Sequence, residues 1–226
     1  MSNEKSANEG NTEMTCPGGG VMMINHQRSK SLDFEKTFSE YIEKYISPDV
    51  KYFSLLRGMY EVKIAQEFAK YPQYFEAFSS CNANFKILGD SAGLSPQSKL
   101  WCGKCPKCAF VYTILRPHLN NEQTIKIFGK ELYEDASLEQ LFKELLGISG
   151  IKPFECVGTN EEMILAMYKI VDHSPLSVTP IVELFKTEIL PKISPSEFLT
   201  LEKKLTKIDD EDNIPEEIKK IINEIH

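Results

Sequence analysis

The spacing of apolar and polar positions predicts a chain that is mostly helical. Residues 33–46 place an apolar side chain every three or four positions, with acidic residues in the first turn and Pro48 beyond the end, which indicates an amphipathic helix. Residues 59–71 have the same period. An almost wholly apolar run begins at Pro106 and stops near Pro117, so we expect a buried helix there. Further helices are predicted over 120–128, 137–146, 160–172, 178–190 and 195–206, and a last one in the charged tail.

Strand signals are few and lie early in the chain. The apolar runs 21–25 and 51–56 each predict a short strand, whereas the polar, Gly- and Asn-rich first twenty residues predict a loop or a docked segment. The glycines of 17–21 precede a strand and lack a phosphate-loop continuation, so they predict a flexible connection. Within the helical part, Ser137 and Gln140 have the spacing of a capping box, which Gly147 would close. Together these elements predict an α+β fold that is mostly helical.

Composition narrows the class of protein. The chain has 226 residues, is 42% hydrophobic and carries a formal net charge of −7. It can therefore bury a sizeable core, but it lacks the general basic surface that nucleic-acid binding requires. The N-terminus has no signal-peptide pattern, and no eighteen apolar residues run together. We expect a cytoplasmic protein that neither enters the membrane nor binds nucleic acid generally.

Four of the six cysteines gather in one part of the sequence. Cys102, Cys105 and Cys108 form two overlapping Cys-x-x-Cys units around Gly103, and this spacing lets thiolates from one tight loop converge on a tetrahedral ion. A closed zinc site needs a fourth donor, for which Cys81 is the candidate, although a lone cysteine is usually a small buried hydrophobe. An iron–sulfur cluster and a redox or nucleophilic thiol are the alternatives. Four thiolates leave no position for water or substrate, so the predicted zinc is structural.

Polar side chains outside the cysteines concentrate in the stretches 2–11, 24–31 and 53–61. The second stretch directly follows a predicted strand and precedes a helix, which is where α/β proteins present ligand groups. Arg57 has the chemistry to bind a carboxylate or a phosphate through two N–H groups. The alternative for each of these residues is a helix cap or a surface ion pair.

Three single residues have structural explanations. Cys156 is a candidate reactive thiol, although a buried cysteine is the default expectation. His118 lies at the end of the apolar helix, where a positive charge would favour the helix dipole, so we expect it to be a cap. His173 has a similar position.

Several stretches together resemble the C-terminal part of a family of ATP-dependent epimerases that act on UDP-N-acetylmuramoyl-L-alanyl-L-glutamate. The resemblance covers about residues 2–170 and is most specific where Cys81 and Asn82 precede the cysteine run. More distantly, the cysteines are similar to the zinc site of 7-cyano-7-deazaguanine synthase, which belongs to the same PP-loop, adenine-nucleotide-hydrolase superfamily. The stretches are SNEKSANEGN, NHQRSKSLDFEKTF, YFSLLRGMYEVKIAQEF, SCNANFK, WCGKCPKCAFVY and KPFECVG.

This resemblance implies a fold, a reaction and a set of site residues. The fold would comprise the later part of an α/β Rossmann-like nucleotide-hydrolase domain over 1–78, a zinc-stapled helical region over 79–175 and a helical extension over 176–226. ATP with Mg²⁺ would adenylate the terminal glutamate carboxylate. The acidified α-carbon would then lose its proton and regain one on the other face, giving D-glutamate for peptidoglycan. The catalytic candidates are His26, Lys30 and Arg57, and the candidates for substrate or cofactor binding are Glu4, Ser6, Asn8, Asn25, Ser29 and Ser54.

One departure from the superfamily is large. Its members hold the ATP phosphates with a Ser-Gly-Gly-x-Asp-Ser loop, and this sequence contains none. The sequence therefore predicts a truncated chain or the product of a split gene, which would need a missing N-terminal segment or partner and would be inactive alone. Two other functions stay open, namely a zinc-stapled binding module without catalysis and a PP-loop ATP pyrophosphatase acting on tRNA or a nucleobase.

Overall fold

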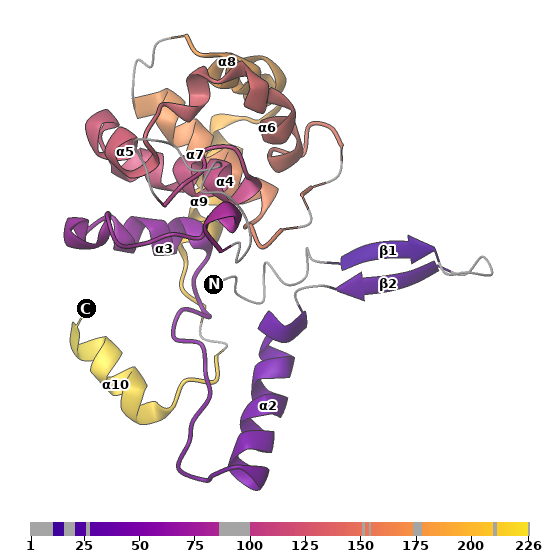
Figure 1. Cartoon of the computed structure of the whole chain (residues 1–226), viewed down its shortest axis with the longest axis vertical. Coiled ribbons are helices and arrows are strands. Elements are labelled where there is room, and N and C mark those ends of the chain that lie inside the picture. Colours follow the sequence, from indigo (N-terminus) through magenta and orange to yellow (C-terminus); the bar gives the residue numbers. More distant parts are fainter. Residues whose placement is uncertain are drawn as a thin grey trace. The chain divides into compact units, whose positions relative to one another are not determined.

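The computed structural model describes residues 11–15, 21–25, 28–85, 100–150, 152–153, 155–173, 178–209 and 212–225. The chain forms two compact units (Figure 1). Unit 1 comprises Met1–Tyr60 and Ile208–His226, and unit 2 comprises Glu61–Lys207. Unit 2 runs across both of the domain boundaries predicted from the sequence, which lie after residues 78 and 175.

Unit 1 contains a strand pair and two α-helices among its described residues. Strands β1 (Asn11–Thr15) and β2 (Val21–Asn25) form a two-stranded antiparallel sheet. A 3-10 turn, η1 (Arg28–Lys30), leads into α2 (Leu32–Tyr45), and α10 (Glu216–Ile225) is the last helix. The helix predicted over 33–46 is thereby confirmed. The hydroxyl oxygen of Ser31 accepts a hydrogen bond from the third residue of α2, which caps that helix.

The strands differ in part from the sequence predictions. The register runs from Asn11 opposite Asn25 to Thr15 opposite Val21, so the strand at 21–25 is confirmed. Of the two alternatives predicted for the first twenty residues, a loop or a docked segment, the loop is wrong for 11–15. The strand predicted over 51–56 is also wrong, because the chain turns at 55–58 and Leu55 is exposed. No parallel sheet occurs among the described residues, and the Rossmann-like domain stays a prediction.

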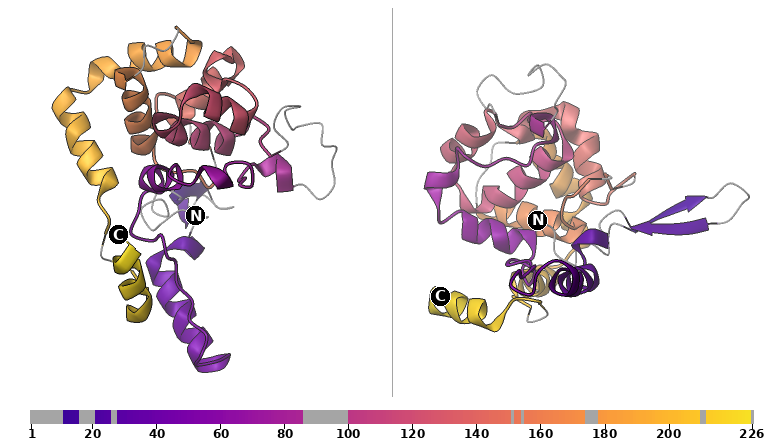
Figure 2. Two further views of the ribbon diagram at one scale, coloured as in Figure 1. Left: turned by 90° about the vertical axis from the view of Figure 1, so that its left-hand side faces the viewer. Right: turned by 60° about the horizontal axis from the view of Figure 1, so that its bottom comes forward.

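Unit 2 is a group of helices arranged around α4 (Pro106–Leu115). This helix contacts α3 (Glu61–Phe68), α5 (Asn121–Phe128), α6 (Glu139–Leu145) and α7 (Asn160–His173), and it lies in the middle of them in Figures 1 and 2. Most of its residues are buried, as predicted. Unit 2 also contains α8 (Pro180–Glu188), α9 (Pro195–Thr206) and the 3-10 helices η2 (Pro72–Tyr74), η3 (Asn82–Phe85), η5 (Arg116–His118), η6 (Leu132–Glu134), η7 (Ala136–Leu138) and η8 (Leu190–Lys192).

The start of α6 corrects one prediction. Asp135 accepts hydrogen bonds from the backbone N–H of Ser137 at 3.1 Å and from its hydroxyl at 2.5 Å. Ser137 is therefore held in η7, and α6 begins at Glu139 without a side-chain cap, so the predicted capping box with Gln140 is wrong. Gly147 follows the helix with φ +70°, a conformation that L side chains rarely adopt, as the prediction for its end requires.

A series of aromatic rings forms much of the core of unit 2. Trp101 immediately precedes Cys102, so these rings extend the apolar core to the cysteines. The ring centroids are 5.2 Å apart for Phe78 and Trp101, 4.8 Å for Trp101 and Phe128, 5.1 Å for Phe128 and Tyr112, 5.0 Å for Tyr112 and Tyr133, and 5.7 Å for Tyr133 and Phe142.

None of the described helices in either unit is long and apolar enough to cross a lipid bilayer.

Candidate functional site

The four predicted metal ligands come together beside the first turn of α4. The sulfur atoms of Cys81, Cys102, Cys105 and Cys108 all lie within 4.8 Å of one another. The Cys108 sulfur is 3.7 Å from that of Cys102 and 3.4 Å from that of Cys105. Four thiolates bound to one tetrahedral zinc ion at about 2.3 Å lie roughly 3.8 Å from one another. The cluster therefore has the dimensions of a site for a single ion.

Local structure directs the thiols toward a common point. Gly103 has φ +65°, which allows a tight turn between Cys102 and the helix. Cys105 is the N-cap residue of α4, so Cys108 lies one turn further along the same helix. Cys81 lies just before η3, and its sulfur accepts a hydrogen bond from the backbone N–H of Cys102 at 3.3 Å.

Mutual contact shifts the thiol pKa values in opposite directions. The hydrogen bond between the Cys105 and Cys108 thiols lowers the pKa of Cys105 to about 5. The same hydrogen bond, together with burial, raises the pKa of Cys108 far above its usual range, and burial raises the pKa of Cys102. Among Cys102, Cys105 and Cys108, these shifts favour a thiolate at Cys105. A bound dication would supply the positive charge that further thiolates need.

The spacing also bears on the alternative chemistries of the cysteines. An iron–sulfur cluster spreads its thiolates around a core of several irons and sulfides, so their sulfur atoms would lie farther apart than those observed here. A redox or nucleophilic thiol needs access, yet Cys81 and Cys108 are fully buried, Cys102 is 8% exposed, and Cys105 alone of the four is half-buried. The donor set fits a closed, single-ion site best. Among the described residues, these four cysteines form the one such cluster of metal-ligating side chains.

Arg57, a catalytic candidate, is buried and uses its charge within unit 1. Its Nε and Nη2 atoms donate to Oε2 of Glu35 at 3.2 and 2.6 Å, and Nη1 donates to the backbone carbonyl of Lys30 at 2.7 Å. The two charged side chains are 5% and 4% exposed. Breaking such a pair leaves an uncompensated charge in the interior, so the pair holds η1 against α2. A role of Arg57 in substrate binding stays a prediction.

The structure brings only some of the other candidates near Arg57. The carbonyl of Ser54 accepts the backbone N–H of Arg57 at 3.4 Å, and both Lys30 and Ser54 are half-buried. Ser29 lies in η1 and is exposed, and Asn25 is the last residue of β2. The remaining predicted site residues lie outside the described part of the chain, namely Glu4, Ser6, Asn8 and His26.

The sequence interpretation does not include Glu162, a fully buried carboxylate. Its Oε2 accepts the backbone N–H of Thr159 at 2.7 Å, and Thr159 Oγ1 accepts the N–H of Glu162 at 3.1 Å, which is a capping box at the start of α7. Its Oε1 accepts the N–H of Val62 in the first turn of α3 at 3.2 Å, and burial raises the pKa of this carboxyl. The Thr-x-x-Glu spacing signals the cap, whereas nothing in the sequence signals the link to α3.

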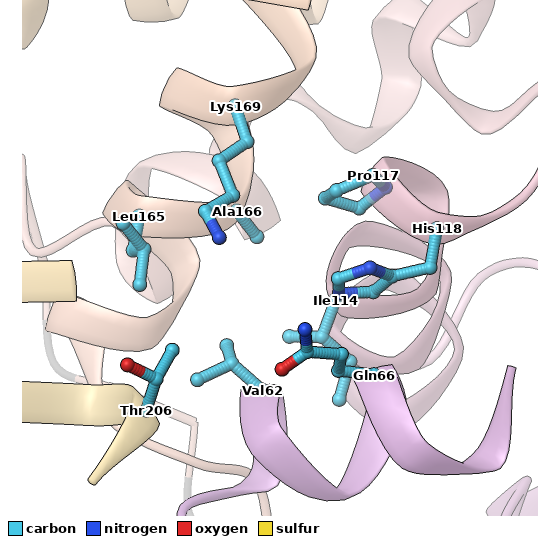
Figure 3. Close-up of a pocket in the computed structure, with 9 residues that line it drawn as sticks. All are labelled: Val62, Gln66, Ile114, Pro117, His118, Leu165, Ala166, Lys169 and Thr206. Atoms are coloured by element: carbon cyan, nitrogen blue, oxygen red, sulfur yellow. The ribbon is translucent and has the colours of Figure 1, made fainter. Parts of the chain in front are cut away.

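A small pocket in unit 2 lies among α3, α4, η5 and α7 (Figure 3). Its volume is about 10 Å³, which is about enough for one water molecule and excludes a substrate. His118 and Lys169 line it, and burial, followed by the charges of Lys169 and Lys63, lowers the pKa of His118 to about 4. The imidazole is therefore neutral near pH 7, and its interpretation as a cap that favours the helix dipole is wrong.

The two other single residues with a structural explanation in the sequence are Cys156 and His173. Cys156 is exposed, so the default expectation of a buried cysteine is wrong there, and it lies outside the four-cysteine cluster. His173 is the last residue of α7, and its side chain lies outside what the structure describes.

Two family models match this sequence, one in its N-terminal part and one in its C-terminal part. A family model described as the MurL C-terminal domain matches residues 77–198, and one described as the MurL N-terminal domain matches residues 1–55. The chain belongs to the MurL family. The match to the MurL C-terminal domain includes all four cysteines of the cluster, and the match to the MurL N-terminal domain includes η1 and α2.

Curated MurL relatives are much longer than this chain. A protein from Xanthomonas oryzae pv. oryzae is 37% identical over 215 residues, which cover 95% of this chain and 45% of the relative. One from Salinispora tropica is 38% identical over 182 residues, which cover 80% of this chain and 37% of the relative. Both are named UDP-N-acetyl-alpha-D-muramoyl-L-alanyl-L-glutamate epimerase. The chain thus spans less than half the length of these relatives, and no solved structure matches it.

Proposed function

We propose that this MurL chain takes part in converting the terminal L-glutamate of UDP-N-acetylmuramoyl-L-alanyl-L-glutamate to D-glutamate, as an isomerase of peptidoglycan synthesis. The observation that carries the proposal is the match at 37% identity over 95% of the chain to a relative named for this epimerisation. The matches to both MurL domains support it. The relatives' names favour epimerisation over a binding module or a tRNA-modifying enzyme.

The reaction requires that a proton leave the glutamate α-carbon on one face and return on the other. The neighbouring carboxylate opposes this step, because its negative charge disfavours a carbanion beside it. We propose, from the family resemblance to PP-loop enzymes, that ATP with Mg²⁺ activates that carboxylate. The charge of Arg57 is already paired with that of Glu35. We therefore propose that the ATP phosphates bind residues outside the described part of the chain, such as Ser6 and His26, or a further segment.

The described residues suggest a division of roles near this site. Lys30, which lies in the described part of the chain, is our candidate for proton transfer, and Ser54 is a candidate for binding substrate. Arg57 fixes the backbone of Lys30 through the 2.7 Å hydrogen bond to its carbonyl. We therefore propose that Arg57 is a positioning residue, which acts on the substrate through Lys30.

We further propose that the four-cysteine cluster binds Zn²⁺. The sulfur spacing and the burial of the thiols support a closed site with four thiolate ligands. Such a zinc ion has no open coordination position, so it would stabilise unit 2 and take no part in proton transfer. Its role would be to join the segment at Cys81 to the start of α4.

The test is a reconstitution in D₂O. The 226-residue chain is incubated with UDP-muramoyl dipeptide, ATP and Mg²⁺, alone or with the part of the Xanthomonas oryzae relative that lies outside the matched region. We expect D-glutamate with one α-deuterium in the mixture and none with the chain alone. Chiral chromatography and mass spectrometry of the released glutamate measure this.

Matched lysine variants assign the proton transfer. Lys30→Ala should abolish deuterium incorporation, whereas Lys36→Ala, an exposed change on α2, should leave it unchanged. D-glutamate from the chain alone would contradict the need for a further segment. Absence of D-glutamate from the mixture would contradict the proposed reaction.

A further inference from the structure

Helix α2 carries a row of aromatic side chains on a face other than its buried one. Phe34, Phe38, Tyr41 and Tyr45 follow one another at helical spacing, with ring centroids 5.6, 6.4 and 5.1 Å apart. Tyr52, from the loop after the helix, packs edge-on against Phe38 at 4.9 Å. We call these five residues the aromatic ridge.

The outer part of the aromatic ridge is open to solvent. The exposed fractions are 52% for Tyr41, 65% for Tyr45 and 39% for Tyr52. Stacked rings with polar hydroxyl tips are the side chains that dominate the centres of protein interfaces, because they combine a large apolar area with a hydrogen-bonding group. Phe34 and Phe38 are half-buried, so the exposed part of the ridge is formed by the three tyrosines, and an exposed aromatic group of this kind marks a contact surface.

An open groove adjoins the aromatic ridge within unit 1. Its volume is about 470 Å³, and Tyr52 belongs both to the ridge and to the groove wall. Most of its other lining residues are polar or charged, among them Lys51, Asp212 and Lys219, and Phe53, Ile214 and Pro215 supply the apolar part. The groove gives the ridge a concave and mainly polar neighbour.

Unit 1 buries few apolar side chains in the part of it whose burial is described, namely residues 28–60, 208–209 and 212–222. In these ranges only Leu32, Ile42 and Tyr60 are buried and apolar, whereas unit 2 contains all the other buried apolar residues described. A stable domain packs its apolar faces around a core. The apolar face of α10 is also partly open, since Ile221 is 52% exposed.

We infer that the aromatic ridge and the adjoining groove dock the remainder of the MurL N-terminal domain, present either in the same polypeptide or in a separate one. The ridge lies within residues 1–55, which match that domain. The Xanthomonas relative has more than half of its length outside the matched region, so the family possesses a polypeptide large enough to cover this face. Its docking surface would be apolar opposite the ridge, with acceptors for the tyrosine hydroxyls, and polar opposite the groove. This inference rests on family membership and is independent of the proposed reaction.

The test measures association directly. The probe is the part of the Xanthomonas relative outside the matched region, produced as a separate polypeptide and titrated into the full 226-residue chain by calorimetry. Tyr41→Glu/Tyr45→Glu should weaken binding at least tenfold, since it replaces two aromatic interface residues by charges that docking would bury. The control is Leu199→Glu, which places a charge at a 59% exposed apolar position on α9 in unit 2 and should leave binding unchanged.

The outcomes separate the possible occupants of the ridge. Circular dichroism and thermal unfolding establish that the probe is folded before it is titrated and that both variants are folded, as expected for changes at exposed side chains. Failure of the probe to bind the wild-type chain, or equal binding by the double tyrosine variant, would overturn the inference. Sedimentation that shows a dimer dissociated by the tyrosine changes, but not by the probe, would assign the ridge to a second copy instead. Docking without D-glutamate formation would support the inference and contradict the proposed reaction.

Discussion

The two units use aromatic side chains in opposite ways. In unit 2, the rings from Phe78 to Phe142 are packed against one another in the interior and reach the cysteine cluster through Trp101. In unit 1, the rings of α2 follow one another at similar centroid distances, yet Tyr41 and Tyr45 are more than half exposed. The difference shows that a regular series of neighbouring rings does not identify a core. Unit 2 covers its own rings, and the rings of unit 1 are available to a partner.

Of the changes that test this difference between the units, removing a thiol from the cysteine cluster should have the largest effect on stability. Structural zinc sites contribute on the order of 10 kcal/mol, which matches the stability of a whole domain. We expect about one zinc per chain in the wild type, and Cys81→Ser and Cys105→Ser should each lose most of it and unfold unit 2. Elemental analysis and circular dichroism measure both effects.

The matched control for the thiol variants is Cys156→Ser, because Cys156 is exposed and lies outside the cluster. It should retain zinc and fold. Zinc content unaffected in Cys81→Ser would show that the fourth ligand lies elsewhere. Iron together with sulfide in the wild-type protein would establish the cluster alternative.

The next largest effect should come from Arg57→Met, which leaves Glu35 buried without its partner. Removing one member of a buried ion pair costs about 3–5 kcal/mol. Hydrogen exchange should accelerate in η1 and α2, while α4 keeps its protection. The double variant Glu35→Leu/Arg57→Met should recover much of the loss, and Lys36→Met is the exposed control. Unchanged protection of α2 in Arg57→Met would contradict the role assigned to this pair.

Two adjacent glutamates in unit 2 give a sharper, smaller contrast. Glu162→Ala leaves the N–H groups of Thr159 and Val62 buried without their acceptor and should lower the free energy of unfolding by about 2–3 kcal/mol. Glu161→Ala removes an ion pair with Lys204 whose side chains are 46% and 50% exposed, so it should cost less than about 1 kcal/mol. Urea unfolding measures both. Equal effects would mean that Glu162 does not join α3 to α7.

The smallest effect concerns the response of unit 2 to acid. The folded pKa of His118 is about 4, below the value near 6.5 of an exposed histidine. Protonation therefore favours the unfolded chain, so this contribution to stability is complete above about pH 6.5 and is lost as the pH falls toward 4. Because the side chain is not fully buried, His118→Gln should remove only about 1–2 kcal/mol of the change between about pH 7 and pH 4.

Two charged side chains near His118 also affect how the stability of unit 2 depends on pH. Lys169 pairs with Glu202 and Lys63 pairs with Glu67, and both lysines disfavour a charged imidazole. Urea midpoints of the wild type and of His118→Gln across this range isolate the contribution of the histidine. Parallel profiles for the two proteins would assign the acid sensitivity to other groups.

Sequence periodicity located the helices whose ends have clear local signals. The helix over 195–206 is confirmed with the predicted bounds. Its start has a complete local signal, because Ser194 and Glu197 form a capping box and Pro195 is the first helical residue. The strand predicted over 51–56 is wrong because a short apolar run does not distinguish a strand from a loop that packs on an aromatic neighbour, as Tyr52 does on Phe38. The capping box at Ser137 is wrong because Asp135, two residues earlier, competes for the same groups.

Sequence spacing also predicted the convergence of the cysteines, since three ligands from one turn require a fourth from elsewhere. The partners of Arg57 and Glu162 were not predictable in this way. Glu35 lies 22 residues from Arg57, and Glu162 lies 100 residues from Val62. Such contacts depend on how whole elements pack, for which a single sequence has no local signal.

The bond from the Cys102 N–H to the Cys81 sulfur joins positions 21 residues apart in the chain. With a metal bound, both ends of the intervening segment would be fastened to the same ion. Cutting the backbone once between Cys81 and Cys102 would then leave two fragments that migrate as one particle under native conditions. The cysteine cluster would then act as a cross-link between the two fragments that a chelator can remove, in addition to the packing of α3 against α4, α7 and α9.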